Sequence, residues 1–183
     1  MTTAMTAASY LLTKSLTGDM QLQKLLYYSQ AWHLAWTGRP LFDDTIEAWQ
    51  KGPVVRCVWI DNKRGHIQPD KDGTGLSAYE TDVINAVYET YGRHGGAALS
   101  GFTHVESPWI EAREGLDANA ASRRPISRKT ILKCMTRKSI HGDKLTPKPP
   151  APQRDASDAQ RFTAAADRQG AKWAETFAEL RLR

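Results

Sequence analysis

Large apolar residues are densest between residues 19 and 55, a stretch that holds three of the six tryptophans. From Met20 to Trp36 the apolar positions surround a helix instead of forming a single stripe. A helix that is apolar all round is a buried helix. Asp19 is well placed to cap its start, and Gly38 followed by Pro40 ends it. We therefore predict a central core helix against which the other segments pack.

Shorter patterned segments flank this helix. Residues 6–16 are predicted to form an amphipathic helix. Residues 46–49 alternate between apolar and polar, and form either a short strand or a structured crossover. Pro53 suits the first turn of a helix, which we expect to end near Asp61. Further helices are predicted over residues 77–91, 97–103, 109–113 and 127–138.

The helix that follows residue 77 has the clearest start signal. Ser77 and Glu80 form a capping box, in which each side chain satisfies a backbone donor of the other residue. Taken together, the pattern predicts a mainly α fold. We expect a compact multi-helix globular domain around a central buried helix, with room for one short β-hairpin and with an added C-terminal amphipathic helix.

The C-terminal part of the chain differs in composition. Residues 145–154 hold four prolines and are predicted to form a semi-rigid linker. The predicted organisation is a domain at 1–140, a Pro-rich linker at 141–155 and a helix at 156–183. The helix carries one narrow apolar stripe that it cannot bury alone, so it folds back, self-associates or binds a partner. The candidate partner-binding residues are Phe162, Trp173, Phe177 and Leu180.

Positive charge is concentrated between residues 121 and 148. This segment holds nine Lys or Arg residues and one acid, whereas the whole chain has a net charge of +5. It is either a solvated cationic face or a surface for an acidic partner or for nucleic-acid phosphates. The absence of aromatic residues there disfavours binding of single strands by stacking. The candidate phosphate-binding residues are Arg123, Arg124, Arg128 and Lys129.

The search for catalytic chemistry is negative. No glycine-rich loop has the phosphate-binding pattern, and no nucleophile lies in a recognisable signature. The histidines at 33, 66, 94, 104 and 141 show no metal-ligand spacing. Cys57 and Cys134 are expected to be reduced, buried thiols. We predict no catalytic residue, metal or cofactor, and no membrane span or signal peptide, so the expected location is cytoplasmic.

Four motifs in a fixed order nevertheless resemble a known family. They are LQKLLYYSQAW at 22–32, GRPLF at 38–42, IEAW followed by KGPVV at 46–55, and TH followed by SPW and AR at 103–113. These motifs are similar to those of the Panacea domain family, which includes phage-associated GepA-type proteins and the SocA proteolytic adaptor and antitoxin. The resemblance covers about the first 140 residues.

The resemblance implies a compact, mainly helical antitoxin domain from a bacterial, phage or prophage toxin–antitoxin system. Members of the family neutralise toxins by direct protein binding, and no catalytic residues come with the family. Within the motifs, Leu25, Trp32, Trp49 and Trp109 are expected in the core. Lys24, His104 and Arg113 are polar residues in apolar surroundings, so each needs a partner or a surface. We expect a polar cluster near the Gly52–Pro53 turn, which either ties elements together or contacts the toxin.

Three functions follow from these observations. The leading one is an antitoxin that holds a cognate toxin protein in a stoichiometric complex, with the C-terminal helix supplying specificity or self-association. A second is a SocA-like adaptor that delivers the toxin to a ClpXP-type protease. A third is a nucleic-acid-binding regulator that uses residues 123–148, with binding that weakens steeply with salt.

Overall fold

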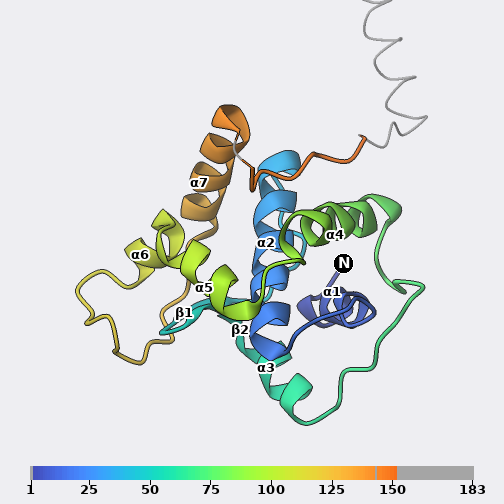
Figure 1. The fold of residues 1–183 in the computed structure, drawn as a ribbon, viewed down its shortest axis with the longest axis horizontal. Helices are drawn as coiled ribbons and strands as arrows, with labels where there is room; N and C mark the ends of the chain where they lie inside the picture. Colours follow the sequence, from blue (N-terminus) through green and yellow to red (C-terminus); the bar gives the residue numbers. More distant parts are fainter. Residues whose placement is uncertain (1, 143, 152–183) are drawn as a thin grey trace, which may run out of the picture. The chain divides into compact units, whose positions relative to one another are not determined.

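Helix α2 (Asp19–Thr37) runs through the middle of the domain (Figure 1). The structure is a computed structural model and describes residues 2–142 and 144–151. All fourteen residues from Gln21 to Leu34 are buried, which confirms the predicted core helix. Gly38 ends α2 in the left-handed conformation at φ 70°, as expected for a glycine cap. Asp19 does not cap the helix, because its carboxylate binds Lys63 and the Asn62 amide.

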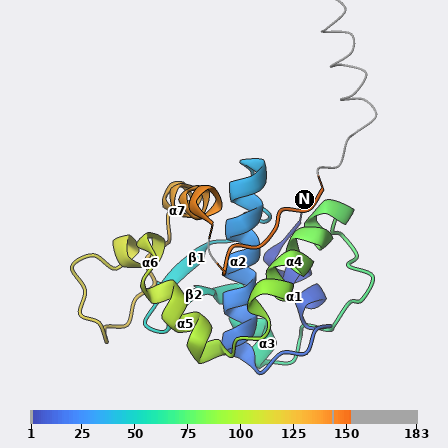
Figure 2. The same ribbon diagram turned by 45° about the horizontal axis from the view of Figure 1, so that its top comes forward.

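The other helices surround α2. On one side lie α1 (Ala4–Leu11) and α4 (Ala78–Tyr91), and on the other lie α5 (Gly96–His104), α6 (Ser107–Ala112) and α7 (Arg128–His141) (Figures 1 and 2). Helix α3 (Arg56–Lys63) lies near the start of α2. The described residues thus contain seven helices and one two-stranded sheet, and the predicted mainly α fold is confirmed.

The two strands form a hairpin, β1 (Ile46–Trp49) paired antiparallel with β2 (Gly52–Val55). The prediction that Pro53 opens a helix is therefore wrong. Pro53 lies opposite Ala48, whose backbone N–H turns away from β2 and donates to the Arg124 carbonyl at 2.8 Å. No donor is required at residue 53, so proline is tolerated in the strand. The helix begins three residues later, at Arg56.

Polar side chains of α2 satisfy the backbone of the irregular segments around it. The Gln23 amide oxygen accepts a 2.8 Å hydrogen bond from the Val55 N–H of β2. The Gln30 amide oxygen accepts from the backbone N–H groups of Leu41 and Phe42. A buried backbone group without a partner is costly, so these glutamines are structural parts of the core. A helix buried on all sides needs such residues wherever its neighbours are not helices.

Several helix limits differ from the predicted ones. Helix α1 starts at Ala4 because the Thr3 side chain caps it by accepting from the Thr6 N–H, and it ends at Leu11 instead of Leu16. Helix α6 starts at Ser107 with Glu106 as its N-cap. The predicted capping box of α4 is present with both hydrogen bonds. Both cysteines are free thiols, but Cys57 is exposed and Cys134 is half-buried, so the prediction of buried thiols is wrong.

Residues 144–151 continue past α7. The Tyr91 hydroxyl donates to the Leu145 carbonyl at 2.5 Å, and Leu145 packs against the core. The first part of the predicted Pro-rich linker is thus in contact with the domain. The predicted C-terminal helix at 156–183 lies outside the described residues, together with its candidate partner-binding residues Phe162, Trp173, Phe177 and Leu180.

Candidate functional site

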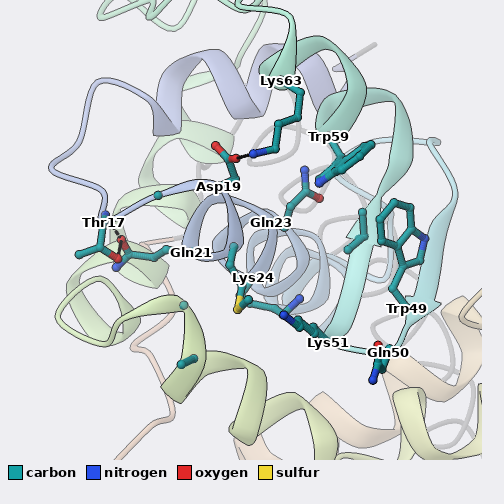
Figure 3. Close-up of a pocket in the computed structure, with 15 residues that line it drawn as sticks. Thr17, Asp19, Gln21, Gln23, Lys24, Trp49, Gln50, Lys51, Trp59 and Lys63 are labelled. Atoms are coloured by element: carbon teal, nitrogen blue, oxygen red, sulfur yellow. Dashed lines mark hydrogen bonds and ion pairs between the residues drawn. The ribbon is translucent and has the colours of Figure 1, made fainter. Parts of the chain in front are cut away.

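A pocket of about 590 Å³ opens where the start of α2, the hairpin, α3 and the start of α5 meet. Trp49 and Trp59 form one wall, with ring centroids 5.3 Å apart, and Thr17 and Gln21 lie on the opposite side (Figure 3). Trp59 is 36% exposed and Trp49 is half-buried. The prediction that Trp49 lies in the core is therefore wrong, because one of its faces borders the pocket.

Lys24 contributes to the same pocket from α2. Its side chain is 1% exposed, and its ammonium group donates a 2.9 Å hydrogen bond to the Pro53 carbonyl of β2. Among the described residues, no carboxylate forms an ion pair with it. Burial lowers the pKa of Lys24 from 10.5 to about 7 because desolvation disfavours the charged form. The domain therefore holds a buried amine whose charge is poised near neutral pH.

Gly52 is the residue that lets β2 approach Lys24. Its φ of +94° lies in a region that favours glycine. A β-carbon at this position would lie 2.6 Å from the Thr103 hydroxyl and 2.8 Å from Lys24 Cε. The lysine of the first motif and the glycine of the KGPVV motif are thus in direct contact.

Arg113 lies on the other side of the hairpin and is 4% exposed. Its Nη1 donates to the Ala48 carbonyl of β1 at 3.2 Å, and its Nη2 donates to the carbonyls of Asp117, Ala118 and Ala120. Nη2 therefore shares its two N–H donors among three carbonyls, and Nη1 uses one of its own two. The guanidinium therefore joins the loop after α6 to the hairpin.

His104 stacks on Trp109, with ring centroids 4.1 Å apart, and Arg113 lies over the same indole at 5.0 Å. The Trp109 N–H donates to the Trp49 carbonyl at 2.8 Å. Burial is the main cause that lowers the pKa of His104, and the positive charges of Lys24 and Arg113 lower it further. Trp109 is half-buried between these two polar side chains and packs against the core, so it lies at the edge of the predicted core and not inside it.

The three polar motif residues thus meet at one hairpin but not at one point. Lys24 holds β2 through Pro53, whereas Arg113 holds β1 through Ala48. Arg113 uses its donors on backbone carbonyls, and His104 stacks against an indole. Of the three residues, only Lys24 lines the pocket.

A second buried polar group was not anticipated from the sequence. Glu106 is 2% exposed and accepts hydrogen bonds from the hydroxyls of Tyr27 at 3.1 Å and Tyr28 at 3.0 Å. It also pairs with Lys138 at 2.6 Å, which ties α7 to α2. The sequence carries one signal for this group, the pair of tyrosines in a helix predicted to be buried on all sides, since a buried hydroxyl requires a partner.

The four candidate phosphate-binding residues are all exposed, and two of them also bond to groups of the domain. Arg128 pairs with Asp43 at 3.0 Å and donates to the Asp43 carbonyl, and Arg124 donates to the Glu114 carbonyl at 2.7 Å. Arg123 and Lys129 are exposed. Two of the four residues therefore act within the domain.

Within residues 2–142 and 144–151, no group of three or more His, Cys, Asp or Glu side chains is arranged to hold a metal ion. The helices of this part of the chain include none with the length and apolar character needed to cross a membrane.

Residues 22–110 match the model of a family of antitoxin-like domains, so the chain carries a domain of the antitoxin class. The family is described as antitoxin SocA-like, Panacea domain. The family predicted from the four motifs is thereby confirmed. Its class implies a toxin as the kind of partner and indicates a non-enzymatic role. No curated protein and no solved structure matches the chain.

Proposed function

We propose that this protein is an antitoxin that neutralises a cognate toxin by direct, stoichiometric binding. The Panacea domain supports the class, and the tryptophan-walled pocket supports the mode of action. Half-exposed tryptophans beside a preformed hollow are typical of the residues that carry most of the binding energy in protein interfaces. That pairing of Trp49 and Trp59 over the pocket is the observation on which the proposal rests.

The charged motif residues support the same choice of surface. Arg113 and His104 are engaged in holding the hairpin, so they are suited to shaping the domain and not to contacting a partner. The pocket lies between the elements that they and Lys24 fix in place. The motifs then define a rigid scaffold, and the pocket rim provides the contact surface.

Co-expression tests the proposal. The product of the reading frame adjacent to this gene is induced in growing cells with and without the protein, in strains that have or lack ClpXP. Neutralisation by binding predicts restored growth and undiminished toxin abundance in both strains. If growth is restored only in the strain that has ClpXP, and toxin abundance falls in that strain, the result would instead support an adaptor. A failure to restore growth in either strain contradicts neutralisation of this toxin.

The C-terminal segment is proposed to add specificity for the toxin. The support is its apolar stripe of Phe162, Trp173, Phe177 and Leu180, which follows the Pro-rich linker. Deleting residues 151–183 is expected to weaken toxin binding or to change the oligomeric state while leaving the domain folded. Unchanged neutralisation and unchanged mass would show that the segment has another role.

A further inference from the structure

Lys24 has donors that the domain does not use. An ammonium group carries three N–H donors, and the only hydrogen bond that Lys24 makes among the described residues is the one to the Pro53 carbonyl. Arg113, also buried and also without a carboxylate partner, donates to four carbonyls instead. The two buried cations therefore differ: the terminal nitrogens of Arg113 donate to four backbone carbonyls, whereas Lys24 makes one hydrogen bond and is one of the residues that line the pocket.

The surroundings of Lys24 add positive potential. The charged residues that line the pocket are Lys24, Lys51 and Lys63 against Asp19 alone, and Asp19 is already paired with Lys63 and bonded to Asn62. His104 lies close enough to Lys24 and to Arg113 for both positive charges to lower its pKa. In the part of the chain that the structure describes, no acid forms an ion pair with Lys24.

Two helix starts also point to the pocket. Helices α2 and α5 begin there, and their N-caps, Gly18 and Gly95, provide no side-chain hydrogen bond. Their first turns are packed together, since a β-carbon on Gly96 would lie 2.9 Å from the Gln21 nitrogen. Helix N-termini carry partial positive charge and favour anions. Together with the buried ammonium of Lys24, which makes a single hydrogen bond, they favour negative charge in the pocket.

The walls determine what else the ligand must carry. Trp49, Trp59, Val54, Met20 and Ala97 give the pocket a mostly apolar lining. A volume of about 590 Å³ accommodates a few side chains. A free inorganic anion would leave these walls uncovered, whereas a peptide segment with an acid between apolar residues would match both the charge and the walls.

We propose that this pocket binds an acidic side chain on an apolar segment of the partner protein, with the carboxylate received by Lys24 and the flanking residues packed on Trp49 and Trp59. This inference rests on the proposed function, because it names the recognition element of the same partner. It makes binding depend on pH: a bound carboxylate favours the charged amine, so affinity is full below about pH 7 and falls as pH rises above it, up to the pKa of the bound state.

A pair of isosteric peptides tests the proposal on the full chain without any toxin. The probes are an acetylated, amidated tripeptide of leucine, aspartate and leucine, and the same peptide with asparagine in the middle. Binding is followed by the NMR signals of the Trp59 indole N–H and of Lys24 Cε. We expect the aspartate peptide to bind at least about tenfold more tightly, the ratio that corresponds to one favourable charge pair.

Two variants complete the test. Lys24→Met is expected to remove the difference between the peptides and the pH dependence, whereas Lys71→Met, at an exposed lysine outside the pocket, is expected to keep both. Equal binding of the two peptides to the wild type, or no saturable shift with either, overturns the proposal even if Lys24→Met fails to fold. The peptide test contains no toxin, so its failure does not change the result of the co-expression test. A failure to neutralise the toxin in cells likewise does not change the result of the peptide test.

Discussion

Gly52 lies so close to Lys24 that a β-carbon at position 52 would be 2.8 Å from Lys24 Cε. The glycine at the start of β2 and a lysine in the first half of the core helix thus lie in close contact. Through this contact and the hydrogen bond to Pro53, the central helix sets the position of the hairpin. The same contact places the lysine at the pocket, so fold and candidate site share one arrangement.

Replacing Gly52 tests this arrangement. Gly52→Ala is expected to lower the free energy of unfolding by about 3 kcal/mol, because the φ of +94° is unfavourable for alanine and Thr103 leaves no room. Urea denaturation followed by tryptophan fluorescence measures the change. Gly101→Ala is the matched control: Gly101 is helical with open space around it, so alanine should stabilise by about 0.5–1 kcal/mol. Equal effects at the two positions would contradict the close contact.

The buried amine of Lys24 predicts a stability that depends on pH. The pKa of Lys24 is lowered from 10.5 to about 7 on folding, so between these values the unfolded chain binds a proton that the folded chain lacks. Stability from this group therefore rises as pH increases across this window, by about 1.4 kcal/mol per pH unit at its steepest. As pH increases, the unfolding free energy of the wild type should therefore rise relative to that of Lys24→Met with this slope. Parallel curves for the two proteins would show that the amine is not desolvated.

Glu106 is predicted to be the most sensitive acid of the domain. Glu106→Gln leaves Lys138 without its ion-pair partner and directs an amide N–H₂ at one of two tyrosine hydroxyls. We expect a loss of about 2–4 kcal/mol in unfolding free energy, the usual range for breaking a buried network. Thermal unfolding compared with Glu114→Gln, at an exposed acid, provides the control. Equal melting temperatures for the two variants would show that the network adds no stability.

The features that could be predicted from the sequence are those that depend on residues close together in the chain. The apolar surround of residues 20–36 predicted α2, and the Ser77 and Glu80 spacing predicted the start of α4. Lys24, His104 and Arg113 were singled out as polar residues inside apolar motifs. In each case the evidence was either a regular spacing of residue types or a polar residue among apolar ones. Both can be read directly from the sequence.

What the sequence did not reveal depends on contacts between distant segments. The preference of Pro53 for the first turn of a helix predicts a helix at this position. Its tolerance in β2 depends on Ala48 bonding to Arg124, 76 residues away from Ala48. Glu106 was missed because its partners come from α2 and α7. The size of Trp49 and Trp109 predicts core positions, whereas Trp49 borders the pocket and Trp109 lies at the edge of the core, stacked on His104.

Trp59 is expected to contribute to binding more than to folding. Trp59 is 36% exposed and forms part of one wall of the pocket. Trp59→Ala removes this part of the wall. We expect toxin affinity to fall by about 2 kcal/mol or more, as for an interface hot spot. Ile140→Ala, at an apolar residue that is 76% exposed on α7, should leave affinity unchanged. Isothermal titration calorimetry with purified toxin distinguishes the two, and a larger loss at Ile140 would place the contact surface on α7.

The most direct measurement is a titration of toxin activity with the purified protein, in the absence of any protease. Neutralisation by binding predicts that toxin activity falls linearly to zero at a fixed molar ratio, and that light scattering gives the mass of a complex with that same ratio. Full toxin activity in the presence of excess protein, with the two proteins scattering as separate species, would contradict direct neutralisation.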